Sequence, residues 1–221
     1  MNPKKRYLRF VSLRFRNYRV FQGVNEFRFN RHQTIIVGGS ATGKTTIVEA
    51  LANLGPKIGI TAHLGLIRRR ARSVVKTEGD RQLLHQYKDL IVLKSEDVMG
   101  VIEKYQRLSK VQDRARMNFQ MILSRKPCKI KPHQDISPRF MAIGERQALY
   151  YAYIFAAREI LELDVPVVID DLYSCLDVEL KQGLSDFLKN QSCQKILLAN
   201  DHLRQEEHAD YVLSLKSARP K

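Results

Sequence analysis

The sequence predicts an α/β domain with a mostly parallel β-sheet. Short apolar segments that are typical of buried strands alternate with segments of helical periodicity along the 221 residues, as in proteins with parallel sheets. The first buried strand, residues 34–37, runs directly into a glycine-rich loop and then into a helix. A chain of this length suits one large α/β domain, and no internal repeat or linker divides it.

The first half of the chain begins with strand-like alternation and passes into a helix. Residues Gly43 to Asn53 have helical periodicity, and Gly55-Pro56 ends it. Residues 56–97 are less regular, and the pairing of any strands there stays open. The expected elements are, in order, strands at residues 8–15, 24–29 and 34–37, a helix at 43–53, and possible strands at 73–77 and 90–93.

The second half begins with a long amphipathic pattern. From Val98 to Ile122, apolar residues recur at alternating spacings of three and four, which predicts one helix of about 25 residues. A proline-containing loop at residues 125–138 follows. The remaining expected elements are helices at 144–161 and 178–189, buried strands at 165–169 and 195–199, and a short strand at 211–215.

The composition excludes several classes of protein. With 44% hydrophobic residues the chain is not wholly disordered, and no apolar run approaches the ~18 residues that a membrane-spanning helix needs. The basic start lacks an apolar stretch of signal-peptide length, so we expect no export. Cys128, Cys175 and Cys193 are odd in number and form no CxxC, which favours reduced thiols in the cytoplasm over disulfides or a zinc site.

The loop after the first buried strand has the pattern G-x-x-x-x-G-K-[ST], in the strand-to-helix context that this motif requires. Its glycines let backbone N–H groups curl around phosphates, the helix N-terminus adds positive potential, and the lysine neutralises the terminal phosphates. We therefore expect ATP or GTP binding, with Mg²⁺ on the Thr45 hydroxyl. The expected nucleotide-binding residues are Gly38, Gly39, Ser40, Ala41, Thr42, Gly43, Lys44, Thr45 and Thr46.

A second carboxylate element follows another buried strand. Asp170 and Asp171 directly follow the apolar residues 166–169, so they lie at the carboxyl edge of the sheet, where ligands of α/β proteins bind. Asp170 is expected to hold Mg²⁺, and Asp171 to orient the attacking water or take its proton. Paired aspartates after a strand also serve as helix caps, so the pair alone is a weak signal.

Together these stretches resemble the ATP-binding-cassette ATPases, and specifically the heads of structural-maintenance-of-chromosomes, RecF and related repair or defence ATPases. The resemblance implies a P-loop NTPase fold with an antiparallel N-terminal β region. It also implies one ATPase head over residues 1–221, with a helical, basic insertion at 56–138. The matching stretches are residues 13–21, the loop at 38–45, the signature-like residues 140–147, the Walker B-like residues 169–171, the D-loop-like residues 174–177, and His202 as the switch histidine.

The resemblance also implies a sandwich of two heads around two ATP molecules. The signature-like loop of one head faces the γ-phosphate held by the other, which assigns nucleotide contacts to Ala142, Gly144, Glu145 and Asp177. His202 is expected to contact the γ-phosphate, where a surface loop histidine is the alternative. The family also uses a glutamine on Mg²⁺; Gln82 and Gln86 lie at plausible positions for it, but the neighbouring residues do not choose between them and the assignment stays open.

The sequence departs from the family pattern at three positions. Ala142 and Ile143 replace a serine and a glycine of the signature, and Asp171 replaces a glutamate. A lost hydrogen bond to a charged acceptor costs roughly 1.5 to 3 kcal/mol, so head engagement is expected to depend on another factor. The shorter carboxylate of Asp171 predicts slow hydrolysis. About a hundred residues separate Lys44 from Gly144, which leaves no room for a long coiled-coil arm.

The net charge of +15 gathers in two segments. Residues 1–20 hold seven Lys or Arg and no acid, and residues 100–131 hold nine against Glu103 and Asp113. Such clusters predict contact with nucleic-acid phosphates, and duplex DNA is the expected partner. A solvated basic face, a membrane surface or an acidic protein partner are the alternatives.

These observations predict a Mg-ATP-binding, slowly hydrolysing ATPase head that dimerises conditionally and couples its nucleotide state to DNA or to an effector protein. DNA repair and anti-phage defence both suit such a head. One alternative is a regulatory nucleotide-binding scaffold with negligible turnover, which Ala142 and Asp171 favour. Another is a transporter ATPase subunit, which the opening strand and the positive charge disfavour.

Overall fold

A computed structural model describes residues 7–52, 72–93, 98–125, 138, 141–173, 175–200 and 211–215. The chain divides into two compact units. Unit 1 comprises Met1–Val92, Val165–Leu172 and Cys193–Lys221, and unit 2 comprises Leu93–Asp164 and Tyr173–Ser192. No helix in the described ranges combines the length and the apolarity needed to cross a bilayer.

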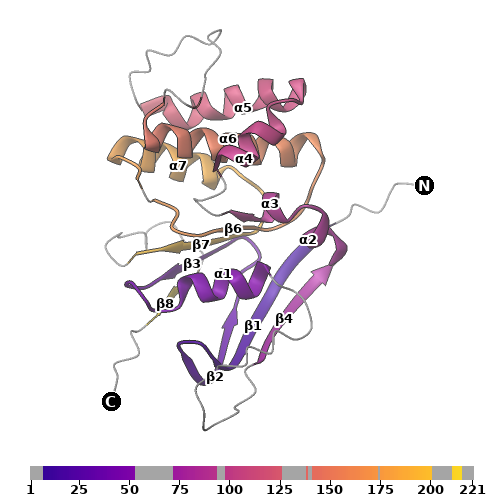
Figure 1. Ribbon diagram of the computed structural model, residues 1–221, viewed down its shortest axis with the longest axis vertical. Coiled ribbons are helices and arrows are strands. Elements are labelled where there is room, and N and C mark those ends of the chain that lie inside the picture. The colour runs from indigo at the N-terminus through magenta and orange to yellow at the C-terminus, as the bar shows by residue number, and fades with distance from the viewer. Residues whose placement is uncertain are drawn as a thin grey trace, which may run out of the picture. The chain divides into compact units, whose positions relative to one another are not determined.

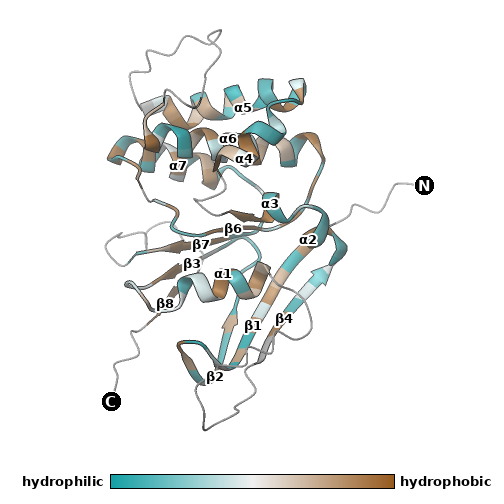
Figure 2. Ribbon diagram, viewed as in Figure 1, coloured by the Kyte–Doolittle hydropathy of each residue, from teal (hydrophilic) through white to brown (hydrophobic). Residues whose placement is uncertain are grey.

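A mostly parallel sheet forms the centre of unit 1 (Figure 1). Strand β3 pairs in parallel with β7 and with β8, and β7 pairs in parallel with β6. The middle strands are buried except at Val37, and Val, Ile and Leu occupy most of their positions, as is usual for parallel sheets (Figure 2). The expected α/β architecture is confirmed. The order of the strands is β5 (Val92–Leu93), β6 (Val167–Ile169), β7 (Lys195–Ala199), β3 (Gln33–Val37) and β8 (Val212–Ser214).

A second sheet of unit 1 is antiparallel and has the strand order β2-β1-β4. The strands are β1 (Leu8–Tyr18), β2 (Phe21–Arg28) and β4 (Arg72–Gly79). Its inner face holds an aromatic cluster in which Phe15 stacks on Tyr18 and Phe21, with ring centroids 5.1 and 4.8 Å apart. Phe27 meets both phenylalanines edge to face. This aromatic packing gives one face of the sheet a rigid core.

The buried amide of Gln194 joins the two sheets. Strand β1 has a bulge between Phe10 and Ser12, and β2 ends at Arg28, opposite Ser12. Beyond that point the Gln194 side chain bonds both backbone groups of Phe10: its Oε1 accepts from the N–H and its Nε2 donates to the carbonyl, each at 2.8 Å. The same Nε2 donates to the carbonyl of Asn30 at 2.8 Å. A side-chain amide thus satisfies backbone groups that would otherwise be buried without partners.

The described residues of unit 1 also form the helices α1 (Lys44–Ala52), α2 (Gln82–Gln86) and α3 (Lys88–Ile91). Helix α1 buries Ile47, Val48 and Leu51 and contacts both β1 and β4. The strand expected at residues 90–93 is largely wrong, because Leu90 and Ile91 lie in α3 and only the last two residues form β5. Four consecutive apolar residues fit a buried helical turn as well as a buried strand, so their periodicity did not distinguish the two.

Unit 2 is helical and contains α4 (Val98–Tyr105), α5 (Ser109–Ile122), the 3₁₀ turn η2 (Leu123–Arg125), α6 (Ile143–Ile160) and α7 (Val178–Lys189). Helices α4 and α5 both pack against α6 (Figure 1), and every residue of α6 from Ala148 to Arg158 is buried. Helix α7 packs on α5, and Gly183 permits the close approach of the Ile122 backbone. The expected helices at 144–161 and 178–189 are confirmed to within one residue.

The single helix expected over residues 98–122 is wrong, because the chain breaks between α4 and α5. Leu108 has extended backbone, with φ −95° and ψ 103°, and is 47% exposed. In a continuous helix, the buried face that includes Tyr105 would include residue 112 two turns later. In the structure, Val111 is buried instead. The break therefore shifts the apolar face by one residue, and a heptad-like pattern hides such a shift.

Candidate nucleotide-binding site

The glycine-rich loop lies between β3 and α1 and is tightly curled. Gly38 still belongs to the sheet edge, since its N–H donates to the Ala199 carbonyl at 3.3 Å. The Thr42 hydroxyl donates to the Gly39 carbonyl at 2.9 Å, and a Cβ at position 38 would lie 2.5 Å from that hydroxyl oxygen. Ala41 and Gly43 have positive φ, at 61° and 102°. The loop thus needs glycine at position 38 for space and at position 43 for its conformation.

The charge of the loop comes from Lys44 and from the start of α1. The Lys44 ammonium donates to the carbonyls of Gly38 and Gly39, at 2.8 Å for the latter. Thr45 is exposed at the helix start, whereas Thr46 is buried. The first turn of α1 carries no acidic residue, so the positive end of its dipole is not neutralised. The loop, the lysine and the helix end together suit a polyphosphate.

The turn between β1 and β2 packs over this loop, which the sequence did not reveal. A Cβ at position 43 would lie 2.7 Å from the Phe21 Cζ atom and 2.7 Å from a Val20 methyl carbon. Arg19, with φ 50°, forms an ion pair with Glu49 of α1. The antiparallel sheet therefore contacts both the loop and its helix. Strand periodicity identifies β1 and β2 but not what their turn touches.

The paired aspartates lie at the same edge of the parallel sheet as the loop. Only β7 separates β6 from β3, and the Leu172 N–H donates to the Leu198 carbonyl at 3.1 Å, which ties the segment after Asp171 to that strand. Asp171 is half-buried and has φ 54°, in the left-handed region that non-glycine residues rarely adopt. The strand pairing thus brings the predicted Mg²⁺ and water-activating residues to the predicted phosphate site.

Asn200 is a further polar residue at this edge, and sequence reasoning missed it. It follows β7 directly, and its Nδ2 lies 3.5 Å from Asp171 Oδ1, at the long limit of a hydrogen bond. Its signal in the sequence is an amide immediately after a buried strand, two residues before His202. His202, Phe140 and Ser174 lie outside the described residues. Gln82 and Gln86 are both exposed on α2, which still does not choose between them.

The signature-like residues belong to unit 2. Ala142 is the N-cap of α6, with φ −58° and ψ 151° and no side-chain capping bond. Gly144 is buried in the first turn, where a Cβ would lie 2.6 Å from the Cys175 carbonyl oxygen. Asp177 caps α7, because its carboxylate accepts from the Leu180 N–H at 2.9 Å. The backbones of the D-loop-like segment and of the start of α6 therefore approach each other closely at Gly144.

The residues present fit Mg²⁺ bound together with a nucleotide. No group of three His, Cys, Asp or Glu side chains suited to a metal occurs among the described residues. Mg²⁺ at phosphoryl-transfer sites needs no such group, because the phosphates and waters supply most of its ligands and one or two protein oxygens suffice. The Thr45 hydroxyl and the Asp170 carboxylate offer those oxygens. The tight cradle at Gly38 and the uncompensated start of α1 offer the phosphate contacts.

Comparison with known proteins supports this fold. A family model described as an AAA domain matches residues 12–54, and no curated protein matches the chain. The head domain of SMC from Thermotoga maritima has a TM-score of 0.62 at 17% identity, covering 93% of this chain and 94% of that one. An SMC head bound to the C-terminal winged-helix domain of ScpA has a TM-score of 0.60 at 12% identity, with 94% of each chain covered.

A third solved structure is an ATP-binding cassette in a dimeric post-hydrolysis state with ADP and Pi. Its TM-score is 0.56 at 12% identity, with 93% of this chain and 94% of that chain covered. The expected resemblance to ATP-binding-cassette heads of the SMC-like class is confirmed at the level of the fold. This chain has the fold of a P-loop ATPase head.

Proposed function

We propose that the chain binds Mg-ATP and hydrolyses it slowly, as one head of an ATP-driven dimer. The observation that supports this most is the arrangement at one sheet edge. The curled loop follows β3 and the paired aspartates follow β6, and these two strands are the neighbours of β7 in the sheet. Ligands of α/β proteins bind at this edge of the sheet, which supports a nucleotide site formed by the cationic, hydroxyl and carboxylate groups of these two segments. The proposal covers residues 1–221 as one ATPase head, with residues 56–138 as its insertion.

Each residue has a proposed role in this reaction. Backbone N–H groups of the loop and the Lys44 ammonium bind the phosphates, and Lys44 exchanges its bonds to the Gly38 and Gly39 carbonyls for bonds to phosphate oxygens. Thr45 and Asp170 hold Mg²⁺, which neutralises charge on the phosphates. Asp171 orients the attacking water and accepts its proton, and His202 contacts the γ-phosphate.

Slow turnover is proposed from the surroundings of Asp171. Its carboxylate reaches one methylene less far than a glutamate, and proton transfer needs heavy-atom distances of about 2.6 to 3.2 Å. Its left-handed backbone, at φ 54°, narrows the positions its side chain can take. The Asn200 amide beside it, at 3.5 Å, further orients the carboxylate. A stiff, short base suits a timed switch better than a metabolic ATPase.

Dimerisation is proposed to be conditional. The N-terminus of α6 would face the γ-phosphate held by a second copy, where Gly144 and backbone N–H groups remain but Ala142 offers no hydroxyl. Similar folds are described in a dimeric, ADP-bound state and in complex with a winged-helix domain. We propose that duplex DNA or an effector protein supplies the missing stabilisation, in DNA repair or anti-phage defence in the cytoplasm.

A regulatory scaffold with negligible turnover is the second candidate. Two observations favour it: the α6 N-cap has no side-chain bond, and the proposed base has a strained backbone. Such a subunit would bind ATP with the same residues. The two candidates therefore differ in turnover and not in nucleotide affinity.

The deciding experiment compares Lys44→Ala with Lys88→Ala, which removes an exposed lysine of unit 1 away from the loop. Equilibrium ATP binding should fall at least about a hundredfold in the first variant, because charge-assisted bonds to phosphate are lost, and less than about twofold in the second. Equal affinities would refute the site. Phosphate release that Asp171→Ala abolishes supports the ATPase, and no release from the unaltered protein, with or without DNA, supports the scaffold.

A further inference from the structure

The antiparallel sheet of unit 1 has an outer face that is cationic. Directly paired residues of antiparallel strands point to the same side of a sheet. The register places Arg14 between Glu26 and Val74, and Ser12 between Arg28 and Lys76. Arg16 is paired with Val24 in the next row. We call this set the outer sheet face: Ser12, Arg14, Arg16, Val24, Glu26, Arg28, Val74 and Lys76.

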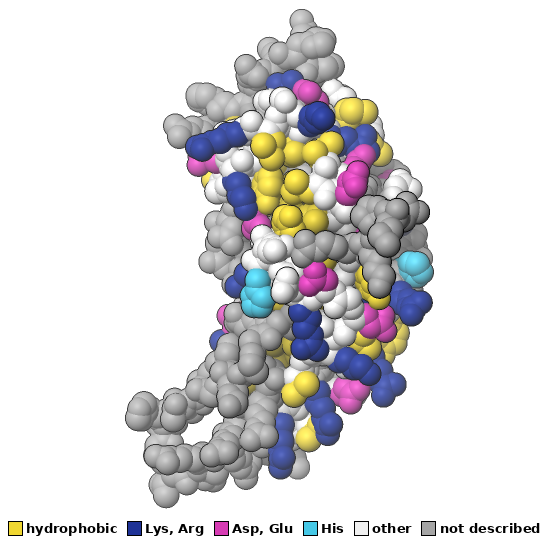
Figure 3. Space-filling model, turned by 90° about the vertical axis from the view of Figure 1, so that its right-hand side faces the viewer, with side chains coloured by type: hydrophobic (Ala, Val, Ile, Leu, Met, Phe, Trp, Pro, Cys, Tyr) yellow, Lys and Arg dark blue, Asp and Glu magenta, His cyan; other side chains and the backbone are white. Residues whose placement is uncertain are grey.

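The cations of the outer sheet face are exposed, and most have no acidic partner. Arg14, Arg16, Arg28 and Lys76 are all exposed. Arg28 lies 3.3 Å from Glu26, and Glu78 is a second exposed carboxylate on this side, two residues from Lys76 on β4. Arg14, Arg16 and Lys76 have no ion pair within the described part of the chain. Figure 3 shows several Lys and Arg side chains over this part of the molecule, with a few apolar and acidic side chains between them.

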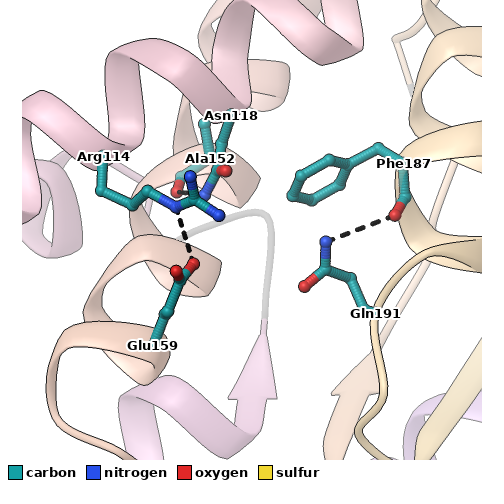
Figure 4. Close-up of polar contacts among 6 residues, drawn as sticks. All are labelled: Arg114, Asn118, Ala152, Glu159, Phe187 and Gln191. Carbon is teal, nitrogen blue, oxygen red and sulfur yellow. Dashed lines mark hydrogen bonds and ion pairs between the residues drawn. The ribbon is translucent and has the colours of Figure 1, made fainter.

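The basic segment of unit 2 differs from this face, because acids neutralise part of it. Arg114 Nε donates to Glu159 Oε2 at 2.7 Å, an ion pair between α5 and α6 (Figure 4). Arg116 lies 3.7 Å from Asp113. Within residues 98–125, these pairs leave Arg107 and Lys110 as exposed cations without an ion pair. Both basic segments of the sequence carry charge, but the sheet concentrates unpaired cations on one regular surface.

The spacing of these cations fits a row of phosphates. Arg14 and Arg16 are two residues apart on one strand, about 6.6 Å, and their cross-strand neighbours are about 5 Å away. Arginine binds phosphate oxygens through two N–H groups at once. The exposed Val24 and Val74, at 56% and 61%, lie between the cations and can cover sugar carbons. A flat strip of this kind matches a backbone that repeats its charge at regular intervals.

We infer that the outer sheet face binds the phosphate backbone of duplex DNA. Proteins that hold single strands stack bases on aromatic side chains, and the outer sheet face contains none. The aromatic residues of the sheet point inward, into the cluster around Phe15. Contacts to phosphates carry no sequence information, so we expect this face to bind duplexes of any sequence. The inference rests on the proposed function only in naming DNA as the partner.

The test measures duplex binding by fluorescence anisotropy over a series of salt concentrations. The triple variant Arg14→Ala/Arg16→Ala/Lys76→Ala removes three unpaired cations of the outer sheet face. The matched control, Lys88→Ala/Arg107→Ala/Lys110→Ala, removes three exposed cations elsewhere. Both remove the same net charge, so a general effect of charge changes both alike. Each variant is also measured for ATP affinity, which separates this inference from the proposed function.

The triple variant should bind duplex DNA at least about tenfold more weakly, and its slope of log affinity against log salt should flatten by about 3, near 0.9 for each lost phosphate contact. The control should keep both values, and both variants should keep their ATP affinity. An unchanged slope in the triple variant, or no duplex binding by the unaltered chain at low salt, overturns the inference. Equal loss of binding to anionic vesicles or polyglutamate would also overturn it, by assigning the face to another partner.

Discussion

The two helix starts that the sequence assigns to phosphate differ in how they are built. The loop before α1 has a backbone that glycines permit and packing fixes, a lysine, and no acid in the following turn. The start of α6 has an alanine N-cap without a side-chain bond and carries Glu145 in its first turn. A carboxylate there stabilises the helix but opposes an incoming anion.

This difference suggests that the two units control different steps of the proposed reaction: unit 1 controls nucleotide binding, and the start of α6 controls dimerisation and turnover. In the proposed function, the loop, Lys44 and the paired aspartates of unit 1 bind the nucleotide, so we expect ATP affinity to depend on unit 1. The start of α6 retains Gly144 but has no hydroxyl at position 142. We therefore expect it to bind the γ-phosphate of a second copy weakly until DNA or an effector protein stabilises the dimer. We therefore expect changes in unit 2 to alter turnover while ATP affinity stays constant.

The largest effect is expected from Gly144→Ala. The new Cβ would lie 2.6 Å from the Cys175 carbonyl, a backbone atom, so the start of α6 must move away from the D-loop-like segment. Turnover should fall at least about tenfold, because misplacement by about 1 Å is enough to do this. ATP affinity should change less than about twofold. Steady-state phosphate release and calorimetric ATP binding measure the two quantities.

Gly100→Ala is the matched control for that change, because position 100 lies in α4 with no atom near its added Cβ. It should raise the free energy of unfolding by about 0.5 to 1 kcal/mol through helix propensity and leave turnover unchanged. If Gly144→Ala lowers ATP affinity as strongly as turnover, the proposed division between the two helix starts is wrong.

Ala142→Ser should have the opposite and smaller effect. The hydroxyl can cap α6, worth about 1 kcal/mol of stability, and can donate to a phosphate of a second copy. We expect ATP-dependent dimerisation, measured by light scattering, to strengthen about tenfold. Ala142→Gly separates the two roles, since glycine caps nearly as well as serine but has no hydroxyl. Equal dimerisation by the serine and glycine variants would show that capping alone is responsible.

The smallest expected effect concerns pH and the core of unit 2. Burial raises the pKa of Tyr153, partly offset by the Arg116 guanidinium nearby. Because the folded pKa exceeds the unfolded one, the neutral phenol contributes full stability below pH 10.0, and this is lost as pH rises through the folded pKa. Tyr153→Phe should therefore flatten the alkaline decline in the free energy of unfolding.

Chemical denaturation at neutral pH and above pH 10.0 tests this, with the exposed Tyr211→Phe as its control. Burial also raises the pKa of Tyr173, which a hydrogen bond from Ser185 opposes, so part of the decline should remain. A decline unaltered by Tyr153→Phe would assign alkaline unfolding to other groups.

The sequence predicted the parallel sheet, the loop at Gly38 to Thr45 and helix α7, because each has its own local signal. The hydrophobic period of the strands, the placement of glycines in the loop and the capping aspartate Asp177 before α7 each act on residues that are close in the sequence. It did not predict the break at Leu108, because the apolar spacing continues across it and only packing against α6 selects the shifted face. Contacts such as Phe21 over Gly43, or Asn200 beside Asp171, join residues far apart in the chain and have no local signature.

The amide of Gln194 has a mechanical consequence. Gln194 directly precedes β7, and its three hydrogen bonds connect the start of β7 to Phe10 of β1 and to Asn30. A pull along β1 therefore loads these bonds together in shear, as in a strand pair, and does not peel them one at a time. Both sheets of unit 1 should therefore resist such a force together, because Gln194 directly precedes β7.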